Sequence, residues 1–248
     1  MTLETLLTRL IWTRRVWLAA ALLCGILHVI AVLIYLYGAW AQYVLMRNGL
    51  PGFAQVNMQM VRLVQFWGSQ LDGVLQVARF LCFVITVVWV WFAGRFALAA
   101  NPERKPRFGP WVTAASWFVP IVHFFVPPVA LMDIVRATRV DPLLLGEAEP
   151  QNQSRDMVLL ILVAHGLYIA AILSGRYMSA LAGVAQGLPE IMLHVLHLAA
   201  GNSVVVLLWL VALDALLHRM SEAQETRLAR GRLPDRQELP PRFEPPTI

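Results

Sequence analysis

The stretch that decides the fold is residues 116–138, which read SWFVPIVHFFVPPVALMDIVRAT. It is apolar enough to enter a lipid bilayer, yet Pro120, Pro127, Pro128 and His123 lie in its middle. Each proline lacks a backbone N–H donor and costs about 3 kcal/mol inside a helix. The arms on either side, 111–119 and 129–138, are long enough for only about half of the hydrocarbon core. We therefore expect residues 111–138 to form a proline-broken re-entrant or amphipathic hairpin, with five transmembrane helices as the alternative.

The composition places the chain among integral membrane proteins. Of its 248 residues 58% are hydrophobic and 14% are charged, whereas soluble domains carry about 25% charged residues. The first apolar run exceeds the roughly 7–15 residues of a cleavable signal peptide, so a retained membrane anchor is expected. Besides the hairpin, four runs are long and apolar enough to cross a bilayer: 16–43, 80–100, 157–175 and 203–218. The predicted fold is an all-α membrane protein built on a four-helix transmembrane bundle.

The arginines and lysines favour the hairpin over a fifth span. With four spans and a hairpin that returns to its starting side, 16 of the 20 lie on one side and 4, among them Arg79, on the other. With five spans the best division is 12 against 8. Since cytoplasmic loops hold the excess of positive charge, we expect both termini in the cytoplasm. The excess of basic over acidic residues suits contact with anionic lipid head groups and does not indicate a nucleic-acid partner.

The hairpin region also carries a recognisable motif. Its elements are Pro110, then Trp117, Phe118, Val119, Pro120 and Ile121, then Pro127, Asp133, Ile134, Arg136, Ala137 and Thr138. This order resembles the signature of a bacterial membrane-protein family named for the domain of unknown function 4328, over about residues 71–218. Five positions depart from that signature: Trp111 replaces glycine, His123 asparagine, Asp133 glutamate, Val135 tryptophan and Thr138 serine. The resemblance implies a membrane fold and a place in the inner membrane of a bacterium, and it brings no activity with it.

Ionisable side chains at membrane depth are costly and mark candidate sites. Asp214 lies near the end of the last apolar run, and Asp133 and Arg136 are spaced to face each other on the returning arm. With Arg95 they are expected to form a charged ring at the cytoplasmic interface. This ring either docks the hairpin or lines a path for ions or protons.

Three histidines, His28, His123 and His165, fall at comparable depths. If they converge, they suit a haem or a metal ion; otherwise each binds a neighbouring carbonyl. Cys24 and Cys82 lack metal-type spacing and are expected to be buried free thiols.

A second candidate metal site lies between the last two apolar runs. Glu190, His194 and His197 follow at helical spacing and project from one face. They can contribute to a divalent metal site, or they form the wet face of an interfacial helix.

The remaining residues, 221–248, form a polar tail. A helical start and a disordered, proline-rich cytoplasmic extension are expected, which could dock a protein partner. Without catalytic motifs, the first functional hypothesis is a non-enzymatic membrane scaffold or partner subunit. The alternatives are a small channel or transporter with a re-entrant pore segment, and a haem- or metal-binding membrane protein.

Overall fold

The computed structural model describes residues 2–49, 56, 58–101, 106–138, 151–184 and 188–231. These contain four long helices, which are α1 (Leu3–Asn48), α3 (Met58–Ala100), α6 (Gln151–Val184) and α7 (Pro189–Gly231), and two shorter ones, α4 (Pro110–Ser116) and α5 (Val122–Thr138). The four long helices are each long and apolar enough to cross a membrane. The predicted all-α membrane bundle is therefore confirmed.

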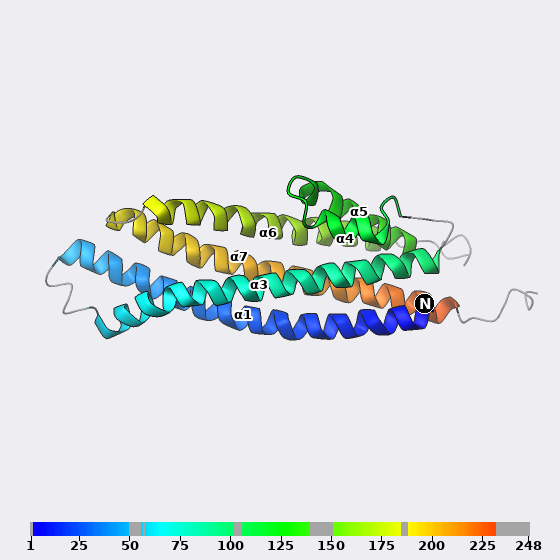
Figure 1. Ribbon diagram of the computed structural model, residues 1–248, viewed down its shortest axis with the longest axis horizontal. Helices are drawn as coiled ribbons and strands as arrows, with labels where there is room; N and C mark the ends of the chain where they lie inside the picture. The colour runs from blue at the N-terminus through cyan, green and yellow to red at the C-terminus, as the bar shows by residue number, and fades with distance from the viewer. Residues whose placement is uncertain are drawn as a thin grey trace, which may run out of the picture.

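The long helices alternate in direction and lie side by side (Figure 1). One end of the bundle, here called the terminal end, holds the start of α1, the end of α3, the start of α6 and the end of α7 (Figure 1). The opposite end is called the distal end. Helix α1 packs against both α3 and α7, and α7 packs in turn against α6. The long helices therefore pack in the order α3, α1, α7 and α6, with α1 and α7 as the inner pair.

The ends of α1 illustrate how local sequence sets the helix bounds. The Thr2 side chain accepts a hydrogen bond from the Thr5 N–H at 3.3 Å, which satisfies one unpaired donor of the first turn. Gly49 ends the helix with a φ of 57° and donates its N–H to the Leu45 carbonyl. A residue with a side chain rarely adopts this left-handed conformation, so glycine suits the position.

Helices α4 and α5 form the expected hairpin, which packs against α3 and α6 in the half of the bundle nearer the terminal end (Figure 1). It starts beyond the end of α3 and returns toward the same end before α6 begins (Figure 1). With 7 and 17 residues, neither arm matches the length of the long helices. The five-helix alternative needs one continuous helix here, and the described structure has a turn.

The position of the break differs from the one expected. Pro120 lies in the turn between the arms, but Pro127 and Pro128 lie inside α5 and are buried. The arms are consequently unequal rather than matched. The prolines are accommodated because a side chain from another helix replaces one of the missing donors, as described below.

The last helix also differs from the expectation. Helix α7 runs unbroken from Pro189 to Gly231, so Glu190, His194 and His197 belong to its first turns rather than to a separate interfacial helix. The helix also covers the start of the predicted tail, as expected, and residues 232–248 lie outside the described part of the chain.

The main apolar core occupies the half of the bundle that contains the hairpin. Trp17, Trp89, Phe96, Ile134 and Leu216 are among its fully buried members, drawn from α1, α3, α5 and α7. Toward the distal end only two small clusters are present among the described residues. The hairpin thus completes the apolar core of the half nearer the terminal end. In the distal half no described segment packs in the equivalent position.

Candidate functional site: a polar strip and a distal cavity

A strip of polar side chains runs along the interface between α1 and α3. Trp17 donates its indole N–H to Thr86 at 3.0 Å, Arg79 donates to His28 at 2.8 Å, and Tyr35 donates to Asp72. His28 and Tyr35 are seven residues apart on α1, as Asp72 and Arg79 are on α3. Because seven residues make about two helical turns, the antiparallel helices bring these side chains together in pairs. We call these six residues the polar strip.

The hydrogen bonds define the state of His28. Its Nδ1 lies 2.8 Å from the Cys24 carbonyl oxygen, to which it donates, and its Nε2 accepts from the Arg79 Nε. An imidazole that donates at one nitrogen and accepts at the other is neutral. Arg79 is therefore held at membrane depth by a neutral partner rather than by a carboxylate.

The charge count placed Arg79 on the outer side of the membrane, directly before a span expected to begin at residue 80. The residue lies within the membrane-length part of α3, and its side chain is partly buried against His28. The matching seven-residue spacings of His28 and Tyr35 and of Asp72 and Arg79 were the available indication. Nothing in the sequence, however, specified that α1 and α3 would pair in this register.

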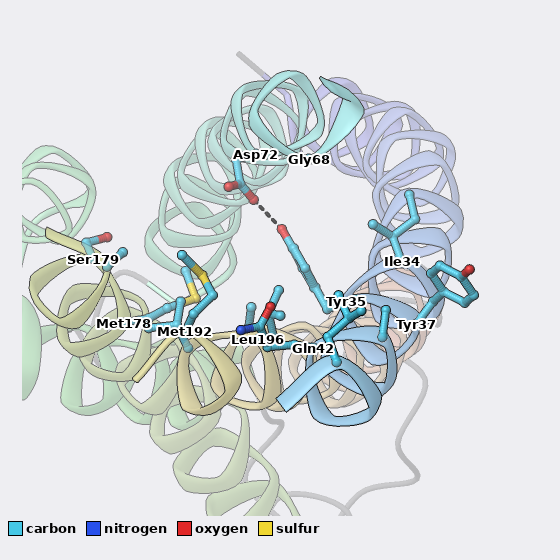
Figure 2. Close-up of a pocket in the computed structure, with 16 residues that line it drawn as sticks. Ile34, Tyr35, Tyr37, Gln42, Gly68, Asp72, Met178, Ser179, Met192 and Leu196 are labelled. Carbon is cyan, nitrogen blue, oxygen red and sulfur yellow. Dashed lines mark hydrogen bonds between the residues drawn. The ribbon is translucent and has the colours of Figure 1, made fainter. Parts of the chain in front are cut away.

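The polar strip ends at a cavity of about 490 Å³ near the distal end. All four long helices contribute to its wall, which is mostly apolar and includes Met178, Met192 and Leu196. Figure 2 shows Tyr35 reaching from α1 across to the Asp72 carboxylate on α3, with the methionines of α6 and α7 on another side. The sequence analysis missed this cavity, because its wall is assembled from four separate helices.

A second cluster surrounds the turn of the hairpin. Tyr168 of α6 lies against Trp117 at 5.9 Å, His123 at 6.0 Å and His165 at 6.2 Å between ring centroids. Phe83 of α3 packs on the same tyrosine at 5.9 Å. The motif residue Trp117 is buried at the centre of this aromatic cluster, whereas its neighbour Phe118 is 58% exposed and contacts Phe83.

His165 replaces a hydrogen bond that a proline removes. In a regular helix the Phe124 carbonyl would accept from the N–H of residue 128, but Pro128 has none. The His165 Nε2 lies 3.1 Å from this carbonyl oxygen and donates to it from α6. A side chain of α6 thus ties the hairpin to the bundle at the point where α5 lacks its own donor.

The three predicted histidines do not converge. His123 and His165 share the aromatic cluster at the hairpin turn, while His28 lies between α1 and α3 in the polar strip. Burial lowers the pKa of His123, and the positive charge of Arg176 lowers it further, while a hydrogen bond to the Pro120 carbonyl opposes this shift.

The second candidate metal site is exposed. Glu190, His194 and His197 project outward from α7, and the His197 ring bonds to the carbonyl of Leu193 in its own helix at 2.9 Å. Within the described ranges, no group of three or more histidine, cysteine or acidic side chains has the geometry to hold a metal ion. Cys24 and Cys82 are buried free thiols.

Of the four charged residues of the expected ring, Asp133 and Arg136 lie together, whereas Arg95 and Asp214 have other surroundings. Asp133 lies 4.0 Å from Arg136 and 3.7 Å from Arg107, which the sequence analysis had not assigned to it. The Arg95 guanidinium lies over the Trp91 ring. Asp214 has a buried carboxylate oxygen without a hydrogen-bond partner among the described residues. The structure therefore supports a local cluster around Asp133 rather than a ring.

Comparison with known proteins places these features in a family. The family model described as domain of unknown function (DUF4328) matches residues 54–216, which include α3, the hairpin, α6 and most of α7. No curated protein and no solved structure matches the chain. The motif around Trp117 and Pro120 lies within the matched range and forms the hairpin turn. The chain therefore belongs to the DUF4328 family.

Proposed function

We propose that the protein is a multi-pass, non-enzymatic component of the bacterial inner membrane that binds a small amphiphilic molecule in its distal cavity. In this proposal the terminal end faces the cytoplasm and the hairpin dips into the lipid beside α3 and α6. The observation that carries the functional part is the cavity of about 490 Å³ among the four long helices.

The proposed orientation follows from charge. Arg9, Arg14, Arg15, Arg219 and Arg227 lie on the helix segments nearest the terminal end. With Arg79 inside the bundle, the arginines toward the distal end among the described residues are Arg47, Arg62 and Arg176. A basic cytoplasmic end suits the positive-inside rule and contact with anionic head groups. The partner-docking role predicted for the proline-rich tail concerns residues outside the described part and remains part of the proposal.

Cysteine labelling tests this topology. Arg107→Cys, before the hairpin, and Arg155→Cys, after it, both replace exposed side chains, whereas the native cysteines are buried. A membrane-impermeant maleimide is expected to label both positions from the cytoplasmic face only. Labelling of the two positions from opposite faces would contradict the re-entrant hairpin.

The chemistry of the cavity supports an amphiphile. Ligand sites in proteins have volumes of about 300–1,000 Å³ and combine an apolar wall with a few polar groups. Here the apolar wall includes Met178, Met192 and Leu196, and the polar groups include Asp72 and Gln42. Methionine side chains are flexible and polarizable, so they adapt to ligands of different shape. A molecule with an apolar body and a polar head group matches this wall.

Ligand protection of an introduced cysteine tests the binding function. Met192 lines the cavity, whereas His194, two residues later on α7, is exposed and is not part of the wall. We expect dodecanol to slow maleimide labelling of Met192→Cys in phosphatidylcholine vesicles and to leave labelling of His194→Cys unchanged. Equal slowing at both positions would indicate a general effect on the membrane and contradict the proposal.

A second pair of variants tests whether a large side chain in the cavity prevents binding. Ala182 lines the cavity, whereas Ala180 on the same helix does not, and both are exposed. In the Met192→Cys protein, Ala182→Trp is expected to abolish protection by dodecanol, and Ala180→Trp to leave it intact. Protection that survives Ala182→Trp would mean that the molecule binds elsewhere.

A further inference from the structure

We infer that the molecule bound in the distal cavity carries a protonated amine, which pairs with the carboxylate of Asp72. This inference rests on the proposed function and names the chemical class of its ligand. It is carried by the hydrogen bonds and charges in and around the cavity wall.

One oxygen of the Asp72 carboxylate is already used, and the other is available. Oδ1 accepts the hydrogen bond from the Tyr35 hydroxyl, which orients the carboxylate on the cavity wall (Figure 2). Among the described residues, no cationic side chain lies within ion-pair distance of Asp72, and Oδ2 has no hydrogen-bond donor. A carboxylate oxygen accepts hydrogen bonds and has no proton to donate when ionised. The complementary ligand group is therefore a cationic donor.

The nearest cation along α3 has another partner. Arg79 lies seven residues beyond Asp72, about two turns deeper in the bundle, and its Nε donates to His28. The Arg79 guanidinium interacts with Asp72 by longer-range electrostatics and not by an ion pair. It interacts with Tyr35 and Cys24 in the same way. Its position leaves the cavity side of Asp72 accessible.

Charged groups on the other helices are directed elsewhere. On α1, Arg47 donates to the Tyr43 hydroxyl at 2.7 Å and lies against that ring. On α6, Arg176 acts on His123 at the hairpin turn, and on α7, Glu190 is exposed and is not part of the wall. Asp72 is therefore the one formally charged side chain among the described residues that line the cavity.

A protonated amine should bind more tightly than a neutral head group of the same chain. Hydrogen bonds to charged groups are stronger than neutral ones, and the surrounding apolar wall strengthens the attraction between opposite charges. We expect dodecylamine to bind about tenfold more tightly than dodecanol, which corresponds to about 1.4 kcal/mol. Dodecanoate should bind more weakly than either, because its carboxylate repels Asp72.

The experiment compares these three molecules in the Met192→Cys protein, reconstituted in phosphatidylcholine vesicles at neutral pH. The concentration that halves the maleimide labelling rate is measured for each, and amounts in the membrane are measured to correct for partitioning. In an Asp72→Asn variant the tenfold preference for dodecylamine is expected to disappear, while protection by dodecanol remains. Asparagine retains an oxygen that can accept the Tyr35 hydrogen bond, so the wall is preserved.

The outcomes separate the inference from the proposed function. If dodecylamine and dodecanol protect equally, or if Asp72→Asn leaves the preference unchanged, the amine assignment is overturned and the cavity remains a binding site. If none of the three protects Met192→Cys while His194→Cys labels normally, the proposed function itself is overturned. A monodisperse elution profile of Asp72→Asn in detergent checks that the variant is folded.

Discussion

The two halves of the bundle are built from the same four helices and differ in what lies between α3 and α6. In the half nearer the terminal end, the hairpin fills this space, and a continuous core of large side chains results. In the distal half no described segment takes the equivalent place, the apolar clusters are small, and a cavity is present. One half therefore has a continuous packed core, and the other contains the cavity in which we propose that a ligand binds. The hairpin is the element that makes the difference.

The largest expected effect comes from removing the centre of the hairpin cluster. Trp117 is 7% exposed, whereas Trp111 on the same arm is 74% exposed. Trp117→Ala is expected to lower the free energy of unfolding by about 3–5 kcal/mol, as for other buried large-to-small changes. Trp111→Ala is the matched control and should have a much smaller effect in the same denaturation experiment. Equal losses would show that the hairpin is not part of the core.

The next effect probes the middle of the polar strip, between the main core and the distal clusters. Arg79→Met keeps the apolar stem but removes the donor to His28, so the variant should lose about 1.5–3 kcal/mol of stability. Adding His28→Phe removes the unpaired acceptor as well, and the double variant should lose less than the sum of the two single changes. Thermal unfolding in detergent measures this coupling. Strict additivity would contradict a direct hydrogen bond.

A third test concerns the contact that joins hairpin and bundle. His165→Phe leaves the Phe124 carbonyl without its donor and is expected to cost about 1–3 kcal/mol. Pro128→Ala supplies the missing backbone N–H, so the same histidine change should cost less in that background. Faster hydrogen exchange in α5 of the His165→Phe variant provides an independent measurement.

Pro127→Ala is the control for this cycle. Its new N–H would serve the His123 carbonyl, with which His165 interacts less strongly than with the Phe124 carbonyl, so it should relieve less of the loss caused by His165→Phe. Equal relief by both proline changes would mean that His165 acts through general packing.

The smallest effect is expected at the hairpin base. Asp133 is buried, but its partners Arg107 and Arg136 are 69% and 67% exposed. Pairs of this kind contribute about 0–1 kcal/mol and are weakened by salt. Asp133→Asn is therefore expected to lower stability only slightly, and the difference from the unmodified protein should shrink in high salt. A salt-independent loss above this range would indicate a buried role for the cluster.

The hairpin region shows how far sequence reasoning could go. Three prolines and two short arms predicted a fold-back, and the described structure has one with its turn at Pro120. The same reasoning placed Pro127 and Pro128 in the break, because it could not include the donor that His165 supplies from α6. Local rules count the hydrogen bonds that a proline removes, but they do not identify a replacement from another helix.

The candidate site was less accessible to such reasoning. Ionisable residues were sought inside apolar runs, so His28 was found and Arg79, at the edge of a run, was assigned to the outer side of the membrane. Tyr35 and Asp72 were not considered, because neither is unusual until the two helices are paired. The convergence of His28 with His123 and His165 was left open, because depth alone does not specify which face of a helix a residue occupies.

The sequence by itself determined that the chain is a membrane protein with four long apolar helices and a hairpin that turns at a proline. These properties depend on hydrophobicity, helix length and missing backbone donors, which are local and additive along the chain. The tertiary structure decided which polar groups meet, where the core ends and where the cavity lies. Those features depend on the relative rotation and register of helices that are distant in sequence, and they arise only when all of the helices pack together.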